Sequence, residues 1–341
     1  MHVETGKRER RRRLILAALL GLLLILGLLS VLWGRYAISL PQLFGILVSR
    51  AIPTEASWPA MAENIVWYVR LPRILLAILV GAALSVSGAS YQCIFRNPMA
   101  APDVLGASTG SAFGAALAIV QGLDGMGITL CAFLSGLLCM GLVMLCTRFS
   151  RGSPVLGLIL SGIMISSLFQ AGTSYIKLIA DPHDTLPEIT YWMMGSLSGA
   201  GVEDLAWLWI PLLLGFVPLF LLRWKINLLT MEEEQARALG ISTRRLRGVV
   251  IVCATLLVAA SVSVSGIIGW VGLVVPHMAR KLVGSDCRVL LPASFLLGGG
   301  FLLLVDDLAR TLYTTELPLG ILTAVIGAPF FLYLLSRKEE G

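Results

Sequence analysis

Long apolar runs that are almost free of charge dominate this sequence of 341 residues. Three of them lie near 14–33, 74–94 and 126–147, and a helix needs about 20 such residues to cross the hydrocarbon core of a bilayer. Charged residues make up only 13% of the chain and hydrophobic residues 57%, whereas soluble domains carry about 25% charged residues. The sequence therefore predicts an all-α integral membrane protein.

Apolar runs separated by polar breaks predict ten membrane-spanning helices in residues 14–336. The first run is as long as a full span, so we expect it to be retained rather than cleaved as a signal peptide. Glycines interrupt the stretch 248–284, and one helix there is expected to be short or broken. The predicted spans are 14–33, 74–94, 103–121, 126–147, 155–177, 204–222, 248–265, 267–283, 289–308 and 318–336.

The distribution of Lys and Arg predicts the orientation, because cytoplasmic loops next to spans are enriched in them. With the N-terminus inside, ten spans place 20 of the 26 basic residues on the cytoplasmic side. The basic tail 1–13 and the short tail 337–341 are then both cytoplasmic. The net charge of +6 fits this topology better than nucleic-acid binding, because the basic residues lie beside apolar runs.

The sequence offers few residues for catalysis. No phosphate-binding GxxxxGK[ST] motif occurs, and GASTGSAFG has no lysine to reach a phosphate, so this chain is not expected to bind ATP by that route. Only His2, His183 and His277 could supply an imidazole, too few to predict a catalytic triad or a zinc site. The six cysteines show no CxxC spacing and are expected to act as small apolar residues. No enzyme activity, metal site or cofactor is predicted on this chain.

Ionisable residues are rare inside the predicted spans. Such groups are costly in lipid and persist mainly where they function. Here Asp103, Asp306, Asp307 and Glu316 fall close to predicted span ends. The pattern favours energy supplied by a partner protein, with an ion-coupled secondary carrier as the alternative.

Two polar segments interrupt the membrane pattern. The outward segment 178–191 runs into the apolar piece WMMGSLSG, and a short outward-side helix is expected there. The inward loop 231–247, MEEEQARALGISTRRLR, is long and highly charged for a connection in a compact bundle. We interpret this loop as a contact surface for a partner.

Several motifs in order along the chain resemble one family closely, the FecCD-type permease subunits of iron-siderophore, haem and cobalamin importers. The resemblance covers about Val66 to Leu335 and implies the fold of type II ATP-binding-cassette (ABC) importers. It also implies two permease subunits, here expected to be identical, two cytoplasmic ATPase subunits that carry ATP-Mg, and an extracytoplasmic binding protein. The motifs are RLPR at 70–73, GAALSVSGASYQCIFRNPMAAPDVLGASTGSAFG at 81–114, WMMGSL at 192–197, ARALG at 236–240, GIIGWVGLVVPHMAR at 266–280, DDLAR at 306–310 and ELPLGILTAVIGAPFF at 316–331.

The resemblance also implies site residues. Arg70, Arg73 and Arg310 would meet acidic groups of the binding protein, since guanidinium groups pair well with carboxylates. For Arg310, an internal pair with Asp306 or Asp307 on the same helix is the alternative. The coupling element that enters the ATPase would consist of Ala236, Arg237, Ala238, Leu239 and Gly240.

Candidates for the pathway or its gate come from two segments. The resemblance implies that the expected outward helix lines the pathway together with the spans 155–177 and 318–336, which makes Trp192, Gly195 and Ser196 candidates. Asn97 and Pro98 break the chain between the second and third spans, which a purely structural helix break also explains. An iron(III)-siderophore is the expected cargo, with haem, cobalamin or molybdate as alternatives. A bacterial or archaeal cell membrane is the expected location.

Overall fold

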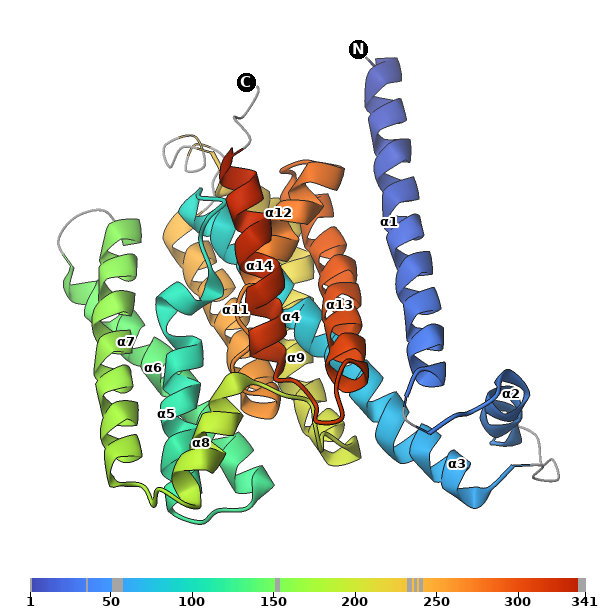
Figure 1. The fold of residues 1–341 in the computed structure, drawn as a ribbon. Coiled ribbons are helices and arrows are strands. Elements are labelled where there is room, and N and C mark those ends of the chain that lie inside the picture. The colour runs from blue at the N-terminus through green and yellow to red at the C-terminus, as the bar shows by residue number, and fades with distance from the viewer. Residues whose placement is uncertain are drawn as a thin grey trace.

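The computed structural model describes residues 2–34, 36–50, 58–150, 154–231, 235, 238 and 242–336, and every regular element within them is helical. The long helices run roughly antiparallel in one bundle (Figure 1). The elements are α1 (His2–Leu32), α2 (Leu40–Ser49), α3 (Ala60–Asn64), η1 (Ile65–Arg70), α4 (Leu71–Phe95), η2 (Pro102–Leu105), α5 (Ala107–Val120), α6 (Gly125–Phe149), α7 (Pro154–Ile179), α8 (Thr185–Met194), α9 (Val202–Leu228), α11 (Thr243–Ser265), α12 (Val271–Val283), α13 (Cys287–Thr311) and α14 (Leu319–Ser336).

Seven helices in the described part of the chain are long and apolar enough to cross a membrane. They are α1, α6, α7, α9, α11, α13 and the continuous run 60–95 formed by α3, η1 and α4, while α5 and α14 are apolar but shorter. A helix lies within each predicted span, yet length and composition support seven crossings in the described residues, so the number ten stays a prediction. The chain is thus an all-helical, multi-pass membrane protein.

The start of α1 and the end of α14 lie at the same end of the bundle (Figure 1). An even number of crossings requires this arrangement. We call this the terminal end of the bundle, and we call the end that carries α2, α3 and α8 the opposite end. The side of the membrane that the terminal end faces stays a prediction.

Helix α4 forms the centre of the bundle. In its most apolar window, 83% of the residues are buried, whereas the corresponding figure for α1 is 17%. The sequence explains this contrast, because α4 is rich in Gly, Ala and Ser, which let neighbouring helices approach closely, whereas α1 presents mostly Leu. Helix α1 therefore lies at the edge, with most of its apolar surface facing lipid.

The boundaries differ from the predicted spans in three places. Residues 2–13, predicted as a tail, continue α1 as helix, since Glu, Lys and Arg are good helix formers. The predicted span 103–121 begins as the short turn η2, before α5. Helix α12 has only 13 residues, which confirms that one helix in the stretch 248–284 is short. The sequence reasoning missed α2 and α3, which are too short to register as apolar spans.

Candidate functional site

A cavity of about 700 Å³ opens at the opposite end of the bundle, beside α8. Its walls come from α8, the segment after it, the end of α11 and the loop between α13 and α14. Hydroxyl groups, two carboxylates and two aromatic rings give it a mixed polar lining. The lining residues are Glu188, Tyr191, Trp192, Ser196, Ser198, Val264, Ser265, Gly266, Thr314, Thr315, Glu316 and Pro318.

Backbone contacts around Gly195 hold three elements together at this cavity. The Ser196 N–H donates to the Ser265 carbonyl at 2.8 Å, and the Leu319 N–H donates to the Gly195 carbonyl at 2.8 Å. Gly195 has φ +75°, and a Cβ built there would lie 2.5 Å from the Ile267 carbonyl oxygen. Only glycine fits this position without strain. The predicted residues Trp192, Gly195 and Ser196 thus lie together at the cavity.

Asn97 and Pro98 lie elsewhere, after the end of α4 at the terminal end. Both are exposed, and the Asn97 side chain accepts a hydrogen bond from the Met99 N–H at 2.9 Å. This hydrogen bond gives the Met99 N–H a partner just after α4 ends. A purely structural role for the helix break explains it. The structure therefore separates the two groups of pathway candidates by most of the length of the bundle.

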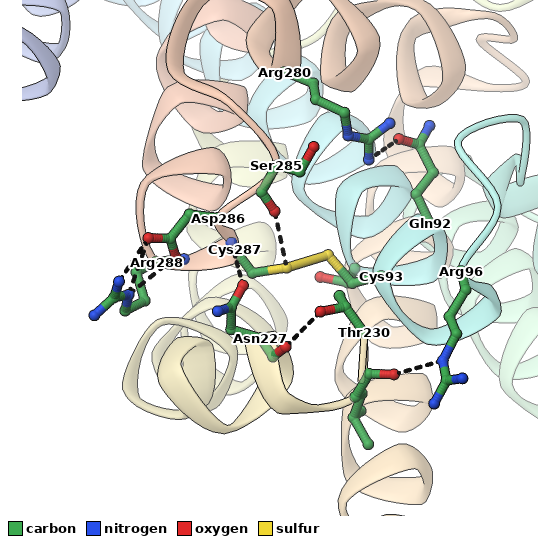
Figure 2. The surroundings of a disulfide bond; sticks show 12 residues. Gln92, Cys93, Arg96, Asn227, Thr230, Arg280, Ser285, Asp286, Cys287 and Arg288 are labelled. Atoms are coloured by element: carbon green, nitrogen blue, oxygen red, sulfur yellow. Dashed lines mark hydrogen bonds and ion pairs between the residues drawn. A yellow bond between two sulfur atoms is a disulfide. The ribbon is translucent and has the colours of Figure 1, made fainter. Parts of the chain in front are cut away.

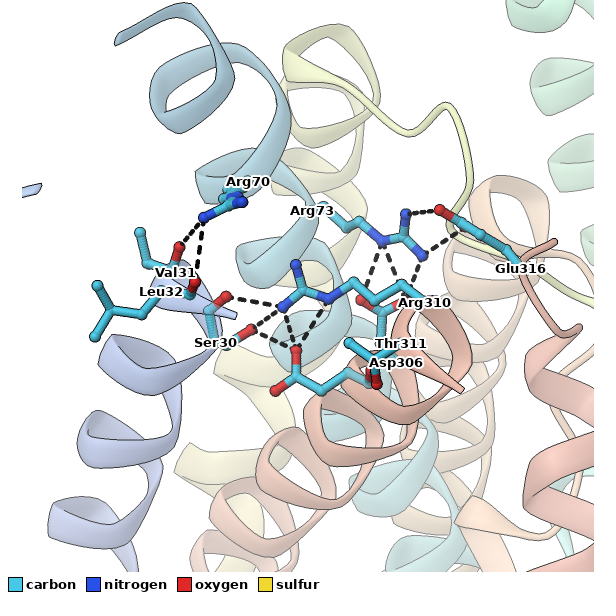
Figure 3. Close-up of polar contacts among 10 residues, drawn as sticks. Ser30, Val31, Leu32, Arg70, Arg73, Asp306, Arg310, Thr311 and Glu316 are labelled. Carbon is cyan, nitrogen blue, oxygen red and sulfur yellow. Dashed lines mark hydrogen bonds and ion pairs between the residues drawn. The ribbon is translucent and has the colours of Figure 1, made fainter. Parts of the chain in front are cut away.

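Arg73 lies between two carboxylates at the opposite end (Figure 3). It donates to Asp306 at 2.9 to 3.2 Å and to both oxygens of Glu316 at 2.9 Å. The Asp306 side chain is fully buried, and that of Glu316 is 27% exposed. Because Glu316 also lines the cavity, this cluster ties α4 and α13 to the cavity wall.

Arg310 and Arg70 have internal partners as well (Figure 3). Arg310 pairs with Asp307 and donates to the Ser30 carbonyl at 2.8 Å, so the internal pair expected as the alternative for Arg310 is present. Arg70 is 4% exposed and donates to the Val31 carbonyl at 2.6 Å. The three arginines thus join α1, α4 and α13 at this end, a network that the sequence alone did not reveal.

The segment predicted to couple to an ATPase lies mostly outside the described residues. Ala236, Arg237, Leu239 and Gly240 belong to the part that is not described, whereas Gln235 and Ala238 are helical. The helices that flank the segment are α9 and α11, and both meet it at the terminal end (Figure 1). The role of these residues stays a prediction.

Two cysteines correct the expectation that all six act as apolar residues. Cys93 at the end of α4 and Cys287 at the start of α13 form a disulfide (Figure 2). The Asn227 side chain accepts a hydrogen bond from the Cys287 N–H at 3.0 Å, which brings the end of α9 to the same place. The two cysteines are 194 residues apart in sequence, so only the packing of α4 beside α13 could pair them.

Comparison with known proteins places this arrangement in one family. Residues 22–337 match the FecCD transport family. The chain is 42% identical to "Molybdate import system permease protein MolB" of Haemophilus influenzae over 96% of each chain. It is 45% identical to "Probable iron chelatin transport system permease protein" of Helicobacter pylori strain 26695, over 81% of this chain and 83% of that one.

A solved structure of a metal-chelate type ABC transporter in an inward-facing conformation has the same fold. It superposes with a TM-score of 0.85 at 41% identity and covers 94% of this chain and 98% of the other. The all-helical bundle, the family match and these relatives agree, and the chain belongs to the FecCD transport family of ABC importer permeases.

Proposed function

We propose that this chain forms the membrane pathway for an iron(III)-siderophore, with ATP hydrolysed by a separate subunit. The cavity beside α8 carries the proposal. Its volume of about 700 Å³ lies in the range of about 300–1,000 Å³ that is usual for sites of drug-sized molecules. A metal held inside an organic chelate is a molecule of this size class, and aromatic and hydroxyl groups suit its mixed surface.

Molybdate is the second candidate, favoured by the similarity to the molybdate permease. A small dianion is usually held by Arg, Lys or backbone N–H groups. The described residues that line the cavity include Glu188 and Glu316 but no Arg or Lys. This charge distribution favours a bulky chelate over a bare oxyanion.

Uptake by reconstituted vesicles tests the proposed cargo. The chain is placed in proteoliposomes with its ATPase and binding protein, and ferric siderophore, haem, cobalamin and molybdate are offered in turn. ATP-dependent uptake of ferric siderophore is expected. Uptake of molybdate alone would replace the first candidate by the second, and uptake driven by an ion gradient without ATP would contradict both.

We propose that the binding protein docks at the opposite end by carboxylate exchange on Arg73. This guanidinium is held by a buried carboxylate, Asp306, and by the partly exposed Glu316. An acidic group of the binding protein would replace Glu316, while Asp306 keeps the arginine in place. Arg70 and Arg310 are enclosed by their own partners and would position this surface.

The Glu316→Gln variant tests the exchange. Removal of the competing charge is expected to tighten binding of the binding protein several-fold. Arg73 keeps its ion pair with Asp306, and the N–H groups that contacted Glu316 become available to a carboxylate of the binding protein. Surface plasmon resonance on the reconstituted permease measures the affinity, with Glu188→Gln, a second carboxylate of the same cavity, as the matched control. Equal affinities for Glu316→Gln and the parent would reject the exchange.

We propose that residues 236–240 couple the permease to its ATPase. The segment joins α9 to α11 at the end where the chain termini lie, and Ala238 is exposed. Ala238→Glu is expected to lower ATP-driven uptake at least about tenfold, since a buried unpaired charge in a protein contact costs several kcal/mol. Thr230→Glu, an exposed position before the segment, is the control. Normal uptake by Ala238→Glu would refute the assignment.

A further inference from the structure

An apolar groove of about 130 Å³ runs between α1, α12 and α13. It lies among helices that belong to the membrane-spanning part of the chain, and α1 contributes its side chains at helical spacing along one face. None of the described residues that line it is charged. Representative lining residues are Leu19, Leu22, Leu26, Met278, Leu297 and Phe301.

Hydrocarbon is the material that suits such a groove. A water molecule needs two to four polar partners, and the described residues of the lining offer only apolar side chains. Leu19 and Leu26 are about 10 Å apart along α1 at 1.5 Å per residue. One leaflet of the hydrocarbon core is about 15 Å deep, so the groove matches part of one acyl chain.

Basic side chains lie beyond the lining of the groove, toward the terminal end of the helices that form it. Arg12 lies two helical turns before Leu19, on the same face of α1, and Lys281 lies one turn after Met278 on α12. Arg288 is the second residue of α13, shares Asp286 with Arg12, and has a side chain that is 52% exposed. Lys281 is exposed too. Arg12 and Arg288 therefore meet at Asp286, and Lys281 lies in the last turn of α12, so each of the three helices carries a cation between the groove and the terminal end.

Asp286 holds the Arg12 and Arg288 side chains in place, and its single negative charge does not neutralise both of them. It accepts from Arg12 at 3.2 Å and from Arg288 at 2.7 Å. The hydrogen bonds from Arg288 lower the pKa of Asp286, so this carboxylate stays ionised and holds both guanidinium groups in place. Lys281 has no such anchor among the contacts of the described residues. Glu9 acts on Arg288 as a second carboxylate, so the three cations exceed the two carboxylates by one positive charge.

We propose that the groove binds one acyl chain of an anionic phospholipid, whose phosphate contacts Arg12, Lys281 and Arg288 in the leaflet at the terminal end. Guanidinium groups pair with phosphate through charge-assisted hydrogen bonds. Basic pockets between transmembrane helices recognise acidic headgroups, and each cation near the membrane surface adds about a fivefold preference. The lipid would fill the space that α1 leaves against α12 and α13.

Native mass spectrometry of the detergent-solubilised permease complex tests the site. Dioleoyl phosphatidylglycerol and dioleoyl phosphatidylcholine are titrated separately, so that the acyl chains are identical and only the headgroup differs. Phosphatidylglycerol is expected to bind about fivefold more tightly, the preference that one uncompensated cation gives. Equal affinity for the two lipids would overturn the proposed headgroup contact.

Two variants test the two halves of the site. Lys281→Gln with Arg288→Gln is expected to remove most of the preference for phosphatidylglycerol, whereas Arg148→Gln with Arg244→Gln, at exposed cations elsewhere, is expected to keep it. Gly300→Leu fills the groove, because a Cβ at Gly300 points toward Leu26 at 3.7 Å, and it should lower the binding of both lipids.

Gly141→Leu is the control for the groove variant, because a Cβ at Gly141 meets no atom within 4 Å. It adds the same side chain to an exposed face of α6. Wild-type binding of phosphatidylglycerol by both the charge variant and the groove variant would overturn the proposal. Because only folded complexes are counted in the spectrum, a loss of folded protein is distinguished from a loss of lipid.

Discussion

Arg73→Gln is expected to lower the free energy of unfolding by about 3–5 kcal/mol, because it leaves a buried carboxylate without its cation. Asp306 is fully buried, and Arg73 is the cation that contacts it with paired hydrogen bonds. In an apolar surrounding, the charge of Asp306 has no water to replace this partner. The loss should therefore exceed that of an ordinary surface ion pair.

Unfolding in sodium dodecyl sulfate, followed by tryptophan fluorescence, measures this change. The double variant Arg73→Gln with Asp306→Asn should recover a large part of the loss, since it removes both charges. Arg288→Gln breaks an ion pair that is 52% exposed on the arginine side, and should cost no more than about 1 kcal/mol. A loss for Arg73→Gln as small as that of Arg288→Gln would mean that Asp306 is solvated or neutral.

The fold class could be predicted from the sequence because lipid imposes a simple rule. Each spanning segment must satisfy its own backbone hydrogen bonds, so apolar runs of sufficient length predict helices with little ambiguity. The same rule does not give the exact bounds of α12, whose last turn carries Arg280 and Lys281, or the short helices α2 and α3, which are not themselves apolar runs of spanning length. Those elements depend on contacts between segments that are distant in sequence.

The site could be predicted in part. The polar break before WMMGSL predicted a short helix, and the family resemblance made Trp192, Gly195 and Ser196 pathway candidates; Trp192 and Ser196 line the cavity, and their pathway role stays a prediction. The partners of Arg73 were hidden, since Asp306 and Glu316 lie more than 230 residues away along the chain. One arginine and two carboxylates lie at predicted span ends on the same predicted side of the membrane. This combination of opposite charges is the signal that could have indicated the pairing. The pairing of Cys93 with Cys287 had no comparable signal.

Gly88 is the position where a substitution should damage the packing of the bundle most. A Cβ built on Gly88 in α4 would lie 1.8 Å from the carbonyl oxygen of Gly272 in α12. The obstacle is backbone, so no rotamer change can relieve it, and α4 and α12 would have to separate. Helix association in lipid depends on such close approach of small residues.

Gly88→Ala is therefore expected to lower the free energy of unfolding by about 1–3 kcal/mol, the usual cost of overpacking, and Gly88→Val should leave little folded protein. The same unfolding titration and the yield of monodisperse protein on size-exclusion chromatography measure the two effects.

Gly141→Ala and Gly141→Val, on an exposed face of α6 with no atom within 4 Å of the added Cβ, are the matched controls. Because alanine favours a helix over glycine by about 1 kcal/mol, Gly141→Ala should be neutral or stabilising. If Gly88→Ala behaved like Gly141→Ala, then α4 and α12 would not be in backbone contact, and the short helix would have to lie elsewhere.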